Sequence, residues 1–341
     1  MQKSPTRTLL KDPRTSPKNS SIFDVLINYK DFRVIGMGPQ SIVYKAICIQ
    51  NHKSVAVKAI RKPLIAKFEE ETTDQESAFE KQKKFLSSLK HYSVLPVLEY
   101  HYSRGKQQTY CVLPFYVSLR ALITQKKTDE TLDLKPTVLV YDIAEALSYV
   151  LRAHNVLHQR IKPENIFFDE KTGNYLLGDW KAPVKIDYKP KGEDSEYFTP
   201  TFSEQITPTV YAAPEMIQKY LGKDVVVNHA KADVFALGMV LLETISPDIF
   251  TKAKELNQTL DEQQYEQLLA EIELDLAKVS KGEFLSKLVG KMLQYDQSKR
   301  ISVFEIGYMV LAEKRIKVAD AWFTASMTEK IDYLSFVSSF S

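Results

Sequence analysis

Strong charge of either sign is missing from this sequence. Its 341 residues carry 46 Lys and Arg against 43 Asp and Glu, which gives a formal charge of only +3. Proteins that hold nucleic acid through electrostatics need a large basic excess, so we expect no nucleic-acid partner. No apolar stretch approaches the roughly 18 residues of a membrane-spanning helix, so we expect no membrane partner either.

Cysteine is also scarce. Cys48 and Cys111 are the only two, and each lies in an apolar, strand-like run typical of a buried thiol in a reducing compartment. The amino terminus is polar and lacks the apolar core of a secretory signal. We therefore expect a cytoplasmic protein. Its composition, 44% hydrophobic and 26% charged, is that of a globular chain long enough for one large domain or two lobes.

Both ends of the chain differ from its middle. Residues 1–28 are basic and Pro-rich at their start, and we predict a disordered tail there. Its Ser-Pro pairs at 4–5 and 16–17 could accept phosphate, although a solvated leader without a role explains them equally well. Residues 316–341 form a C-terminal extension to which the sequence assigns no role.

The middle of the chain is rich in strands first and in helices later. Short β-branched runs predict antiparallel strands at 32–36, 41–50, 54–60, 94–102 and 108–113, with one helix within 66–90. Apolar periodicity predicts helices at 136–153, 232–244, 261–280, 283–295 and 302–314. The order predicts an α+β fold, with a small antiparallel β lobe and a larger, mainly helical lobe. The acidic and apolar helix at 261–280 is either a docking face or an ordinary solvated helix.

Short motifs mark the breaks between these elements. Gly36 and Gly38 separate two strands, and glycine lets backbone N–H groups approach a phosphate, although a turn explains such a pair as well. Lys58 follows Val-Ala-Val in an apolar strand, where a solvent-facing edge lysine is the alternative. Further along are His-Gln-Arg-Ile-Lys-Pro-Glu-Asn at 158–165, Leu-Gly-Asp-Trp-Lys at 177–181, Ala-Pro-Glu at 213–215, Asp233 and Arg300.

In order and spacing, these motifs resemble a protein kinase over residues 29–315, with an N-lobe at 29–114 and a C-lobe at 115–315. The resemblance implies ATP as cofactor, and Lys162 points to Ser/Thr-type ancestry. In the N-lobe, the resemblance assigns Gly36 and Gly38 to the loop that covers the phosphates, Val43 to the cover over the adenine and Lys58 to the phosphate-binding lysine. It assigns Leu113 to the gatekeeper and Pro114, Phe115 and Tyr116 to the hinge. In the C-lobe, it assigns Lys162 and Asn165 to the catalytic loop, and Asn165 and Asp179 to the Mg²⁺ ligands.

The same comparison exposes departures at the catalytic positions. Arg160 stands where the family has its catalytic aspartate, and a guanidinium stays protonated, so it cannot act as a base. Loss of a positioned general base typically costs about 10²–10⁴ in rate. Gln159 replaces the arginine before it. Gln82 falls at the helix position of the family's glutamate, where it can donate a hydrogen bond but not form an ion pair; a slip in register would bring Glu80 there instead.

Two further positions depart from the family. Lys181 replaces the glycine that follows the metal-binding aspartate by two residues, and Pro208 replaces a threonine before the Ala-Pro-Glu motif. Scaffold positions are intact by contrast. Glu215 and Arg300 match a buried ion pair, and Asp233 with Gly238 match the central helix that anchors the catalytic loop.

The charge of the implied site follows from these changes. Lys58, Arg160, Lys162 and Lys181 oppose only Asp179, which gives +3 where a typical member sums to zero. Such a site attracts phosphate without needing a divalent metal. We therefore expect that ATP, if it binds, does so with little or no dependence on Mg²⁺. The alternative is that Arg160 pairs with Asp179 and the cleft is closed.

Two functions are consistent with this pattern. The first is a pseudokinase that acts as a signalling scaffold or allosteric partner of another protein. The second is an active, atypical ATP-dependent Ser/Thr kinase, because the loose transition state of phosphoryl transfer depends chiefly on charge and position. The Ser- and Thr-rich segment at 181–210 is then an inert loop or a partner-driven switch, since Gln159 removes the usual docking arginine.

Overall fold

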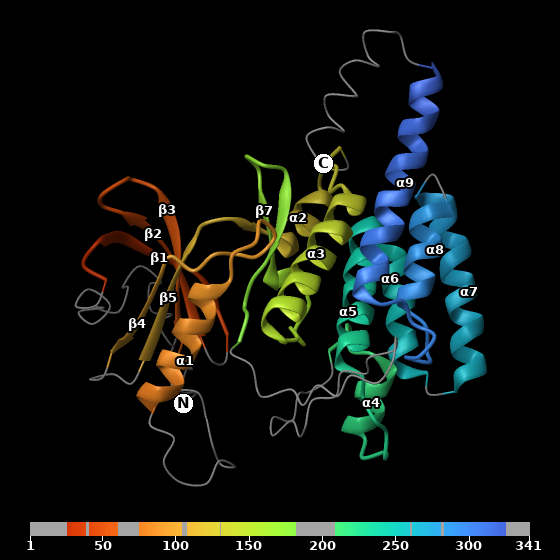
Figure 1. Cartoon of the computed structure of the whole chain (residues 1–341), viewed down its shortest axis with the longest axis horizontal. Helices are drawn as coiled ribbons and strands as arrows, with labels where there is room; N and C mark the ends of the chain where they lie inside the picture. The colour runs from red at the N-terminus through yellow and green to blue at the C-terminus, as the bar shows by residue number, and fades with distance from the viewer. Residues whose placement is uncertain are drawn as a thin grey trace, which may run out of the picture. The chain divides into compact units, whose positions relative to one another are not determined.

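A computed structural model describes residues 26–38, 41–60, 75–103, 108–129, 131–181, 209–259, 261–280 and 283–324 (Figure 1). The chain divides into two compact units, residues 1–67 with 97–115 and residues 68–96 with 116–341. The tail at 1–25, the segment 182–208 with the predicted phosphate acceptors and Pro208, and residues 325–341 lie outside the described residues.

The first unit is built on one antiparallel sheet. Its strands are β1 (Tyr29–Met37), β2 (Ser41–Cys48), β3 (Ser54–Ile60), β4 (Glu99–Ser103) and β5 (Gln108–Pro114), in the order β1-β2-β3-β5-β4. Alternate residues of β2, β3 and β5 supply its core, among them Tyr44, Val55, Val57, Tyr110 and Val112. The predicted antiparallel sheet is confirmed.

One predicted strand begins later than expected. The run 94–102 forms strand only from Glu99, because Val94 and Leu95 serve the second unit instead. Val94 is buried in the large core and forms an isolated bridge with Leu177, and the Leu95 N–H donates to the Leu177 carbonyl at 3.0 Å.

The second unit is mainly helical. Its α-helices are α1 (Gln75–Ser88), α2 (Leu119–Lys126), α3 (Pro136–His154), α4 (Pro214–Tyr220), α5 (His229–Ile245), α6 (Pro247–Ala253), α7 (Glu262–Val279), α8 (Glu283–Met292) and α9 (Val303–Thr324), with 3₁₀ turns η1 (Pro163–Asn165) and η2 (Lys254–Gln258). A small sheet joins β6 (Val117–Ser118), β7 (Ile166–Asp169) and β8 (Asn174–Leu177). This sheet and the short helices α2, α4 and α6 escaped prediction, because so few residues carry no readable period.

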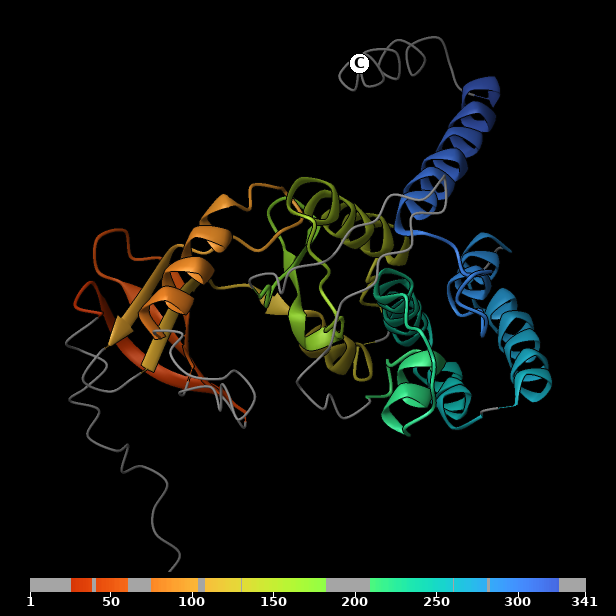
Figure 2. The same ribbon diagram turned by 60° about the horizontal axis from the view of Figure 1, so that its bottom comes forward.

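Helix α5 lies at the centre of this unit, as its apolar sequence predicted. Its residues are buried almost all round, and it contacts α3, α6 and α8 (Figures 1 and 2). Asn228 caps its amino terminus by accepting hydrogen bonds from the N–H groups of Ala230 and Lys231. Because α5 is fixed by packing on several sides, polar side chains projecting from it can position the loops around them.

Two boundaries differ from the predicted ones. Helix α1 was expected within the small lobe, yet by its contacts it belongs to the larger unit, because Phe85 and Leu89 are buried in the larger core. Helix α9 runs to Thr324, so the predicted boundary between domain and extension at residue 315 falls inside a helix. Alanine, lysine and arginine in 312–321 favour this continuation.

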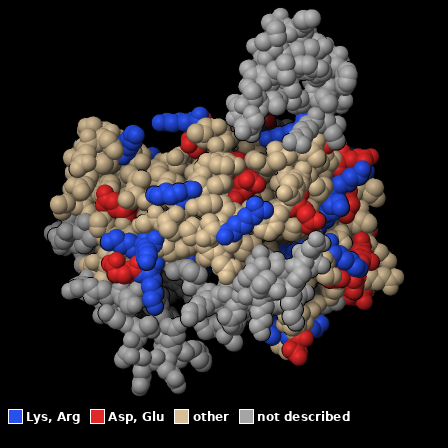
Figure 3. All heavy atoms as spheres, in the orientation of Figure 1, with Lys and Arg blue, Asp and Glu red and all other residues tan. Residues whose placement is uncertain are grey.

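The charge distribution agrees with the near-zero net charge. On the face shown in Figure 3, basic and acidic side chains are interspersed rather than gathered into one field. Among the described residues, no helix is long and apolar enough to cross a membrane.

Candidate functional site

Gly36, Val43 and Lys58, which the resemblance assigns to nucleotide binding, share one row of the first sheet. Gly36 pairs with Val43 across β1 and β2, Val43 pairs with Lys58 across β2 and β3, and Lys58 pairs with Cys111 across β3 and β5. Directly opposed residues of antiparallel strands project from the same face. Lys58 therefore lies on the face opposite to the buried Val55 and Val57, on an interior strand, which excludes the edge-lysine alternative.

The two glycines are not required by the described residues around them. Among these residues, a Cβ added at Gly36 or Gly38 would meet one atom each, at 3.8 Å, which is an ordinary contact, and neither residue has a positive φ. The Gly38 N–H donates to the Ser41 carbonyl at 2.8 Å. The described side chains therefore leave the backbone of both glycines open to close approach.

The gatekeeper and hinge assignments lie at the end of β5. Leu113 pairs with Ala56 on β3, and Phe115 follows the strand directly. The Lys45 ammonium lies 4.1 Å from the centroid of the Phe115 ring, a cation–π contact. Leu113, Pro114 and Phe115 belong to the first unit, and Tyr116 belongs to the second.

In the second unit, α5 holds the catalytic loop through Asp233. Its carboxylate accepts hydrogen bonds from the backbone N–H of His158 (2.9 Å) and of Gln159 (2.7 Å). Burial raises the pKa of Asp233 to about 7, and the two amide donors oppose that rise. Gln159 adopts a φ of 59°, a left-handed conformation that these bonds maintain. The predicted anchor for the loop is therefore present.

His158 links the loop to the segment after β8. Its Nε2 lies 2.9 Å from the Gly178 carbonyl, and its Nδ1 accepts from the Arg160 N–H at 3.2 Å. Burial lowers the pKa of His158 to about 4. The ring is therefore neutral at pH 7, with its proton on Nε2, because only that tautomer satisfies both bonds. Trp180 packs edge-on against it, with ring centroids 4.7 Å apart.

Arg160 forms an ion pair with the residue that the family resemblance names as a metal ligand. Its Nη1 lies 3.1 Å from Oδ2 of Asp179, and the side chains are 42% and 19% exposed. Asn165 supports the arrangement by donating from Nδ2 to the Arg160 carbonyl at 2.9 Å. Asp179 itself has a φ of 67°. The guanidinium thus occupies the side of the carboxylate that a cation would need.

Asp179 is paired with a cation at the position where the family resemblance would place Mg²⁺. Mg²⁺ is usually held by one or two carboxylates together with waters and substrate phosphates. Within the described residues, no three His, Cys, Asp or Glu side chains gather as a metal site. The guanidinium of Arg160 lies against Asp179, and Asn165 donates from its amide nitrogen to the Arg160 carbonyl. Lys162, half-buried on the same loop, makes no ion pair with a described residue.

Helix α1 presents Gln82 to the segment after β8. Its Nε2 donates to the Trp180 carbonyl at 3.0 Å, while Glu80 is exposed. This contact agrees with the predicted helix register, in which Gln82 rather than Glu80 faces the segment after β8. The Trp180 indole is buried and donates from Nε1 to the Leu177 carbonyl at 2.8 Å. Backbone and side chain of Trp180 are both fixed.

Sequence reasoning missed a second polar centre around Arg120 on α2. Its guanidinium bonds Glu164 of the catalytic loop (2.8 Å), Glu243 of α5 (2.6 Å) and the hydroxyl of Tyr211 (2.6 Å). The Tyr211 hydroxyl also donates to Glu243 at 2.7 Å. An arginine after a two-residue strand carries no sequence motif, so only the fold reveals that it ties these segments together.

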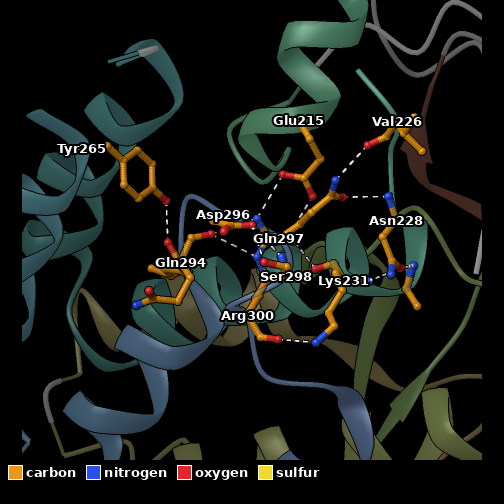
Figure 4. A network of polar contacts seen from close by, with 12 residues as sticks. Glu215, Val226, Asn228, Lys231, Tyr265, Gln294, Asp296, Gln297, Ser298 and Arg300 are labelled. Carbon is orange, nitrogen blue, oxygen red and sulfur yellow. Dashed lines mark hydrogen bonds and ion pairs between the residues drawn. The ribbon is translucent and has the colours of Figure 1, made fainter. Parts of the chain in front are cut away.

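The predicted scaffold ion pair is present and fully satisfied (Figure 4). Arg300, 1% exposed, pairs with both oxygens of Glu215 at 2.7 and 3.0 Å. Its remaining N–H groups donate to the carbonyls of Lys231 and Gln294. All five donors of this buried guanidinium therefore have acceptors. The ion pair joins the start of α4 to the loop before α9.

Comparison with known proteins agrees with this geometry. The family model for the protein kinase domain matches residues 29–310. The chain is 27% identical to the serine/threonine-protein kinase PknD of Protochlamydia amoebophila over 64% of this chain and 23% of that protein. It is 25% identical to an Aurora kinase of Eremothecium gossypii, over 82% of this chain and 68% of that protein.

A plant relative shows the same partial overlap. The L-type lectin-domain containing receptor kinase VIII.1 of Arabidopsis thaliana is 25% identical over 64% of this chain and 28% of its own length. The chain thus spans about a quarter of two of these relatives and two thirds of the third. The match to the family model covers most of the sequence, and the α+β fold with an antiparallel sheet and a helical unit agrees with it. The chain belongs to the protein kinase family.

Proposed function

We propose that this chain is a pseudokinase, which acts on another protein as a signalling scaffold or allosteric partner rather than by phosphoryl transfer. The observation that supports the proposal is the ion pair between Arg160 and Asp179. Arg160 removes the general base of the family's reaction and also places a permanent positive charge on the carboxylate that would hold the metal. One substitution therefore affects two requirements of catalysis.

The intact scaffold supports a role for the folded, kinase-like surface. Asp233 still anchors the catalytic loop, His158 is locked in one tautomer, and the Glu215–Arg300 pair is fully satisfied. Buried polar networks of this kind are costly when incomplete. These networks are complete although the residue at the catalytic position is changed. A protein that acts by binding needs the fold but not the catalytic residue.

We propose further that ATP, when bound, needs no Mg²⁺. Lys58 projects from an interior strand in the same row as Gly36 and Val43, and both glycines leave the backbone accessible to a phosphate. Positive charge on Lys58 can neutralise phosphate oxygens directly. The family's usual cofactor is thus retained as a ligand, while its metal is replaced by the chain's own cations.

A thermal-shift titration tests nucleotide binding. The melting temperature of the full chain is followed with ATP in EDTA and with ATP in excess Mg²⁺, for the native sequence and for Lys58→Ala. We expect a stabilisation of similar size in both conditions that is lost in Lys58→Ala. Absence of a shift in both conditions would overturn the proposal for ATP, and a shift only with Mg²⁺ would overturn the metal-independent part.

Transfer of labelled phosphate from ATP to casein tests the pseudokinase proposal separately. We expect no transfer above background with Mg²⁺ or Mn²⁺. Transfer that disappears in Lys58→Ala would establish the alternative function, an atypical Ser/Thr kinase. Lys58→Ala serves as control because it removes one phosphate contact and leaves the Arg160–Asp179 pair in place.

A further inference from the structure

The four side chains of Arg120, Glu164, Glu243 and Tyr211, here named the Arg120 centre, have no part in the proposed function. Arg120 lies on α2, Glu164 on the 3₁₀ turn η1 of the catalytic loop, Glu243 on α5 and Tyr211 shortly before α4. The guanidinium divides its donors among the other three groups: Nε donates to Glu164, Nη1 to Glu243 and Nη2 to the Tyr211 hydroxyl. Four segments of the second unit therefore meet at one cation.

The contacts of Arg120 with Glu243 and Tyr211 form the buried part of the centre. The Glu243 side chain is 9% exposed, and among the described residues Arg120 is the only cation paired with it. The Tyr211 hydroxyl accepts from Arg120 at 2.6 Å and donates to Glu243 at 2.7 Å. Burial and the Glu243 carboxylate raise the pKa of Tyr211, so this hydroxyl keeps the proton that it donates. Because a buried charge without its partner is strongly unfavourable, these three groups hold one another in place.

The contact of Arg120 with Glu164 forms the exposed part of the centre. The Glu164 side chain is 46% exposed, and its Oε1 lies 2.8 Å from Nε of Arg120. Solvent screens an ion pair of this kind, so it contributes little to the free energy of unfolding. It does connect the catalytic loop to the buried part. The two parts of the centre thus differ in strength and in the segment that each holds.

Tyr211 belongs to a short turn, residues 209–212, at the carboxyl end of the Ser- and Thr-rich segment. The Ala212 N–H donates to the Thr209 carbonyl at 2.9 Å, and the Tyr211 N–H donates to the Thr209 hydroxyl at 3.3 Å. The Tyr211 ring stacks on Phe250 of α6, with ring centroids 5.8 Å apart. Ring and hydroxyl together hold the turn against α5 and α6. All the groups that do so are side chains of this chain, so the contact needs no phosphate.

We propose that Arg120 is a positioning residue that docks the turn 209–212 on α5, whether or not the Ser- and Thr-rich segment carries phosphate. Gln159 stands where many members of the family have the arginine that docks a phosphorylated segment, and Arg120 provides a docking cation from a different element. The surface around the turn is then always formed and available to a partner protein. The inference depends neither on phosphoryl transfer nor on ATP binding.

Amide hydrogen exchange of the phosphatase-treated full chain measures this docking, because an N–H exchanges when its segment opens locally. We expect slow exchange at Tyr211 and Ala212 in the native protein. Arg120→Met should accelerate exchange at least tenfold at these two amides and at Asn165 of the catalytic loop, whose N–H donates to the Lys162 carbonyl at 2.9 Å. Fast exchange at 211 and 212 in the phosphatase-treated native chain, or an unchanged rate in Arg120→Met, would overturn the proposal.

Two milder variants test the two parts of the centre separately, and both keep Arg120 paired with Glu243. Glu164→Ala removes the exposed contact and should accelerate exchange at Asn165 but not at 211 and 212. Tyr211→Phe keeps the ring and removes the hydroxyl, so it should accelerate exchange at 211 and 212 but not at Asn165. The reverse pattern, or no change in either variant, would contradict the assignment of the two contacts.

Lys126→Met is the matched control. Lys126 is another cation on α2 that contacts α5, where its Nζ donates to the Thr244 carbonyl at 3.4 Å, but it bonds neither the turn nor the catalytic loop. We expect native rates at 165, 211 and 212 in this variant. The same acceleration in Lys126→Met as in Arg120→Met, or an equal acceleration along α5 in Tyr211→Phe, would show a general loss of stability and would overturn the positioning role.

Discussion

The Arg160 guanidinium lies 3.1 Å from the Asp179 carboxylate, so the residue that replaces the catalytic base also neutralises the residue that would bind the metal. Sequence reasoning named this pair only as one of two alternatives. The other alternative, a site that binds anions without Mg²⁺, stays a prediction.

Arg160→Ala should create a dependence on Mg²⁺. Removal of the guanidinium leaves Asp179 as a carboxylate without that cation, and hard oxygen ligands favour Mg²⁺. We expect the ATP-induced rise in melting temperature to become larger with Mg²⁺ than with EDTA. Arg160→Lys, which keeps a cation at the same position, is the control and should behave like the native protein. Equal shifts for Arg160→Ala in both buffers would argue against the pair as the cause.

Gln82→Glu should loosen the segment after β8. A carboxylate has no N–H to donate, so it would face the Trp180 carbonyl with like partial charge, and we expect a loss of about 1–3 kcal/mol in unfolding free energy. Gln82→Ala removes the bond without adding a like partial charge and should cost about 1 kcal/mol.

Two readouts check the Gln82 prediction. Urea unfolding measures the free energy of unfolding. In a Trp322→Phe background, tryptophan emission comes from Trp180 alone, and in Gln82→Glu this emission should shift to the red as the indole becomes exposed. The exposed Glu80→Gln, two residues earlier on α1, is the control and should change neither value. Identical emission from Gln82→Glu and the native chain would contradict a role for Gln82 in holding Trp180.

Arg300→Met should be strongly destabilising. The substitution leaves Glu215, 5% exposed, as a buried charge without its partner, which typically costs about 3–5 kcal/mol. Lys287→Met breaks an exposed pair with Glu283 on α8 and should cost far less, because solvent screens such pairs. Chemical unfolding of both variants compares them directly. A cost for Arg300→Met no greater than that for Lys287→Met would refute the bracing role of the buried pair.

Asp142→Asn should stabilise the protein at neutral pH but not in acid. Burial raises the folded-state pKa of Asp142 from 3.8 to about 6. Ionisation of Asp142 is disfavoured in the folded state. Well below pH 3.8 the group is protonated in both states and does not affect the free energy of unfolding. As the pH rises from 3.8 to 6 it lowers that free energy progressively, and above pH 6 the loss is constant. The gap between variant and native stability should therefore widen by roughly 2 kcal/mol from pH 4 to pH 7.

Urea unfolding at several pH values measures that gap. Asparagine can still accept the hydrogen bond that the Tyr175 N–H donates to Asp142 at 2.8 Å, so the substitution isolates the charge. Other groups also change the stability with pH. The lowered pKa values of His158 and His229, for example, make the folded state less stable as pH falls from 6.5 toward 4. These contributions cancel when the variant and the native protein are compared at the same pH. A gap independent of pH would contradict the prediction.

Local sequence determined the elements that are long or strongly patterned. Apolar periodicity was sufficient for α3, α7 and α8, because burial of one face leaves its period in the sequence. A run that is apolar nearly all round was sufficient for α5, and β-branched runs were sufficient for the strands of the first sheet. Motif spacing placed the catalytic loop, Asp179 and the Glu215–Arg300 pair. The short β6, β7 and β8 strands and the helices α2, α4 and α6 were not predicted, since two to eight residues hold too little pattern.

Only the tertiary structure decided which of these side chains meet. Arg160 with Asp179, Gln82 with the Trp180 carbonyl, and Arg120 with Glu164, Glu243 and Tyr211 are 19 to 123 residues apart in sequence. Such contacts depend on helix register and loop geometry, which packing of the whole unit fixes and a local pattern does not record. The sequence by itself placed an arginine at the position predicted for the catalytic base; the fold decided that this arginine forms an ion pair with Asp179, the predicted metal ligand.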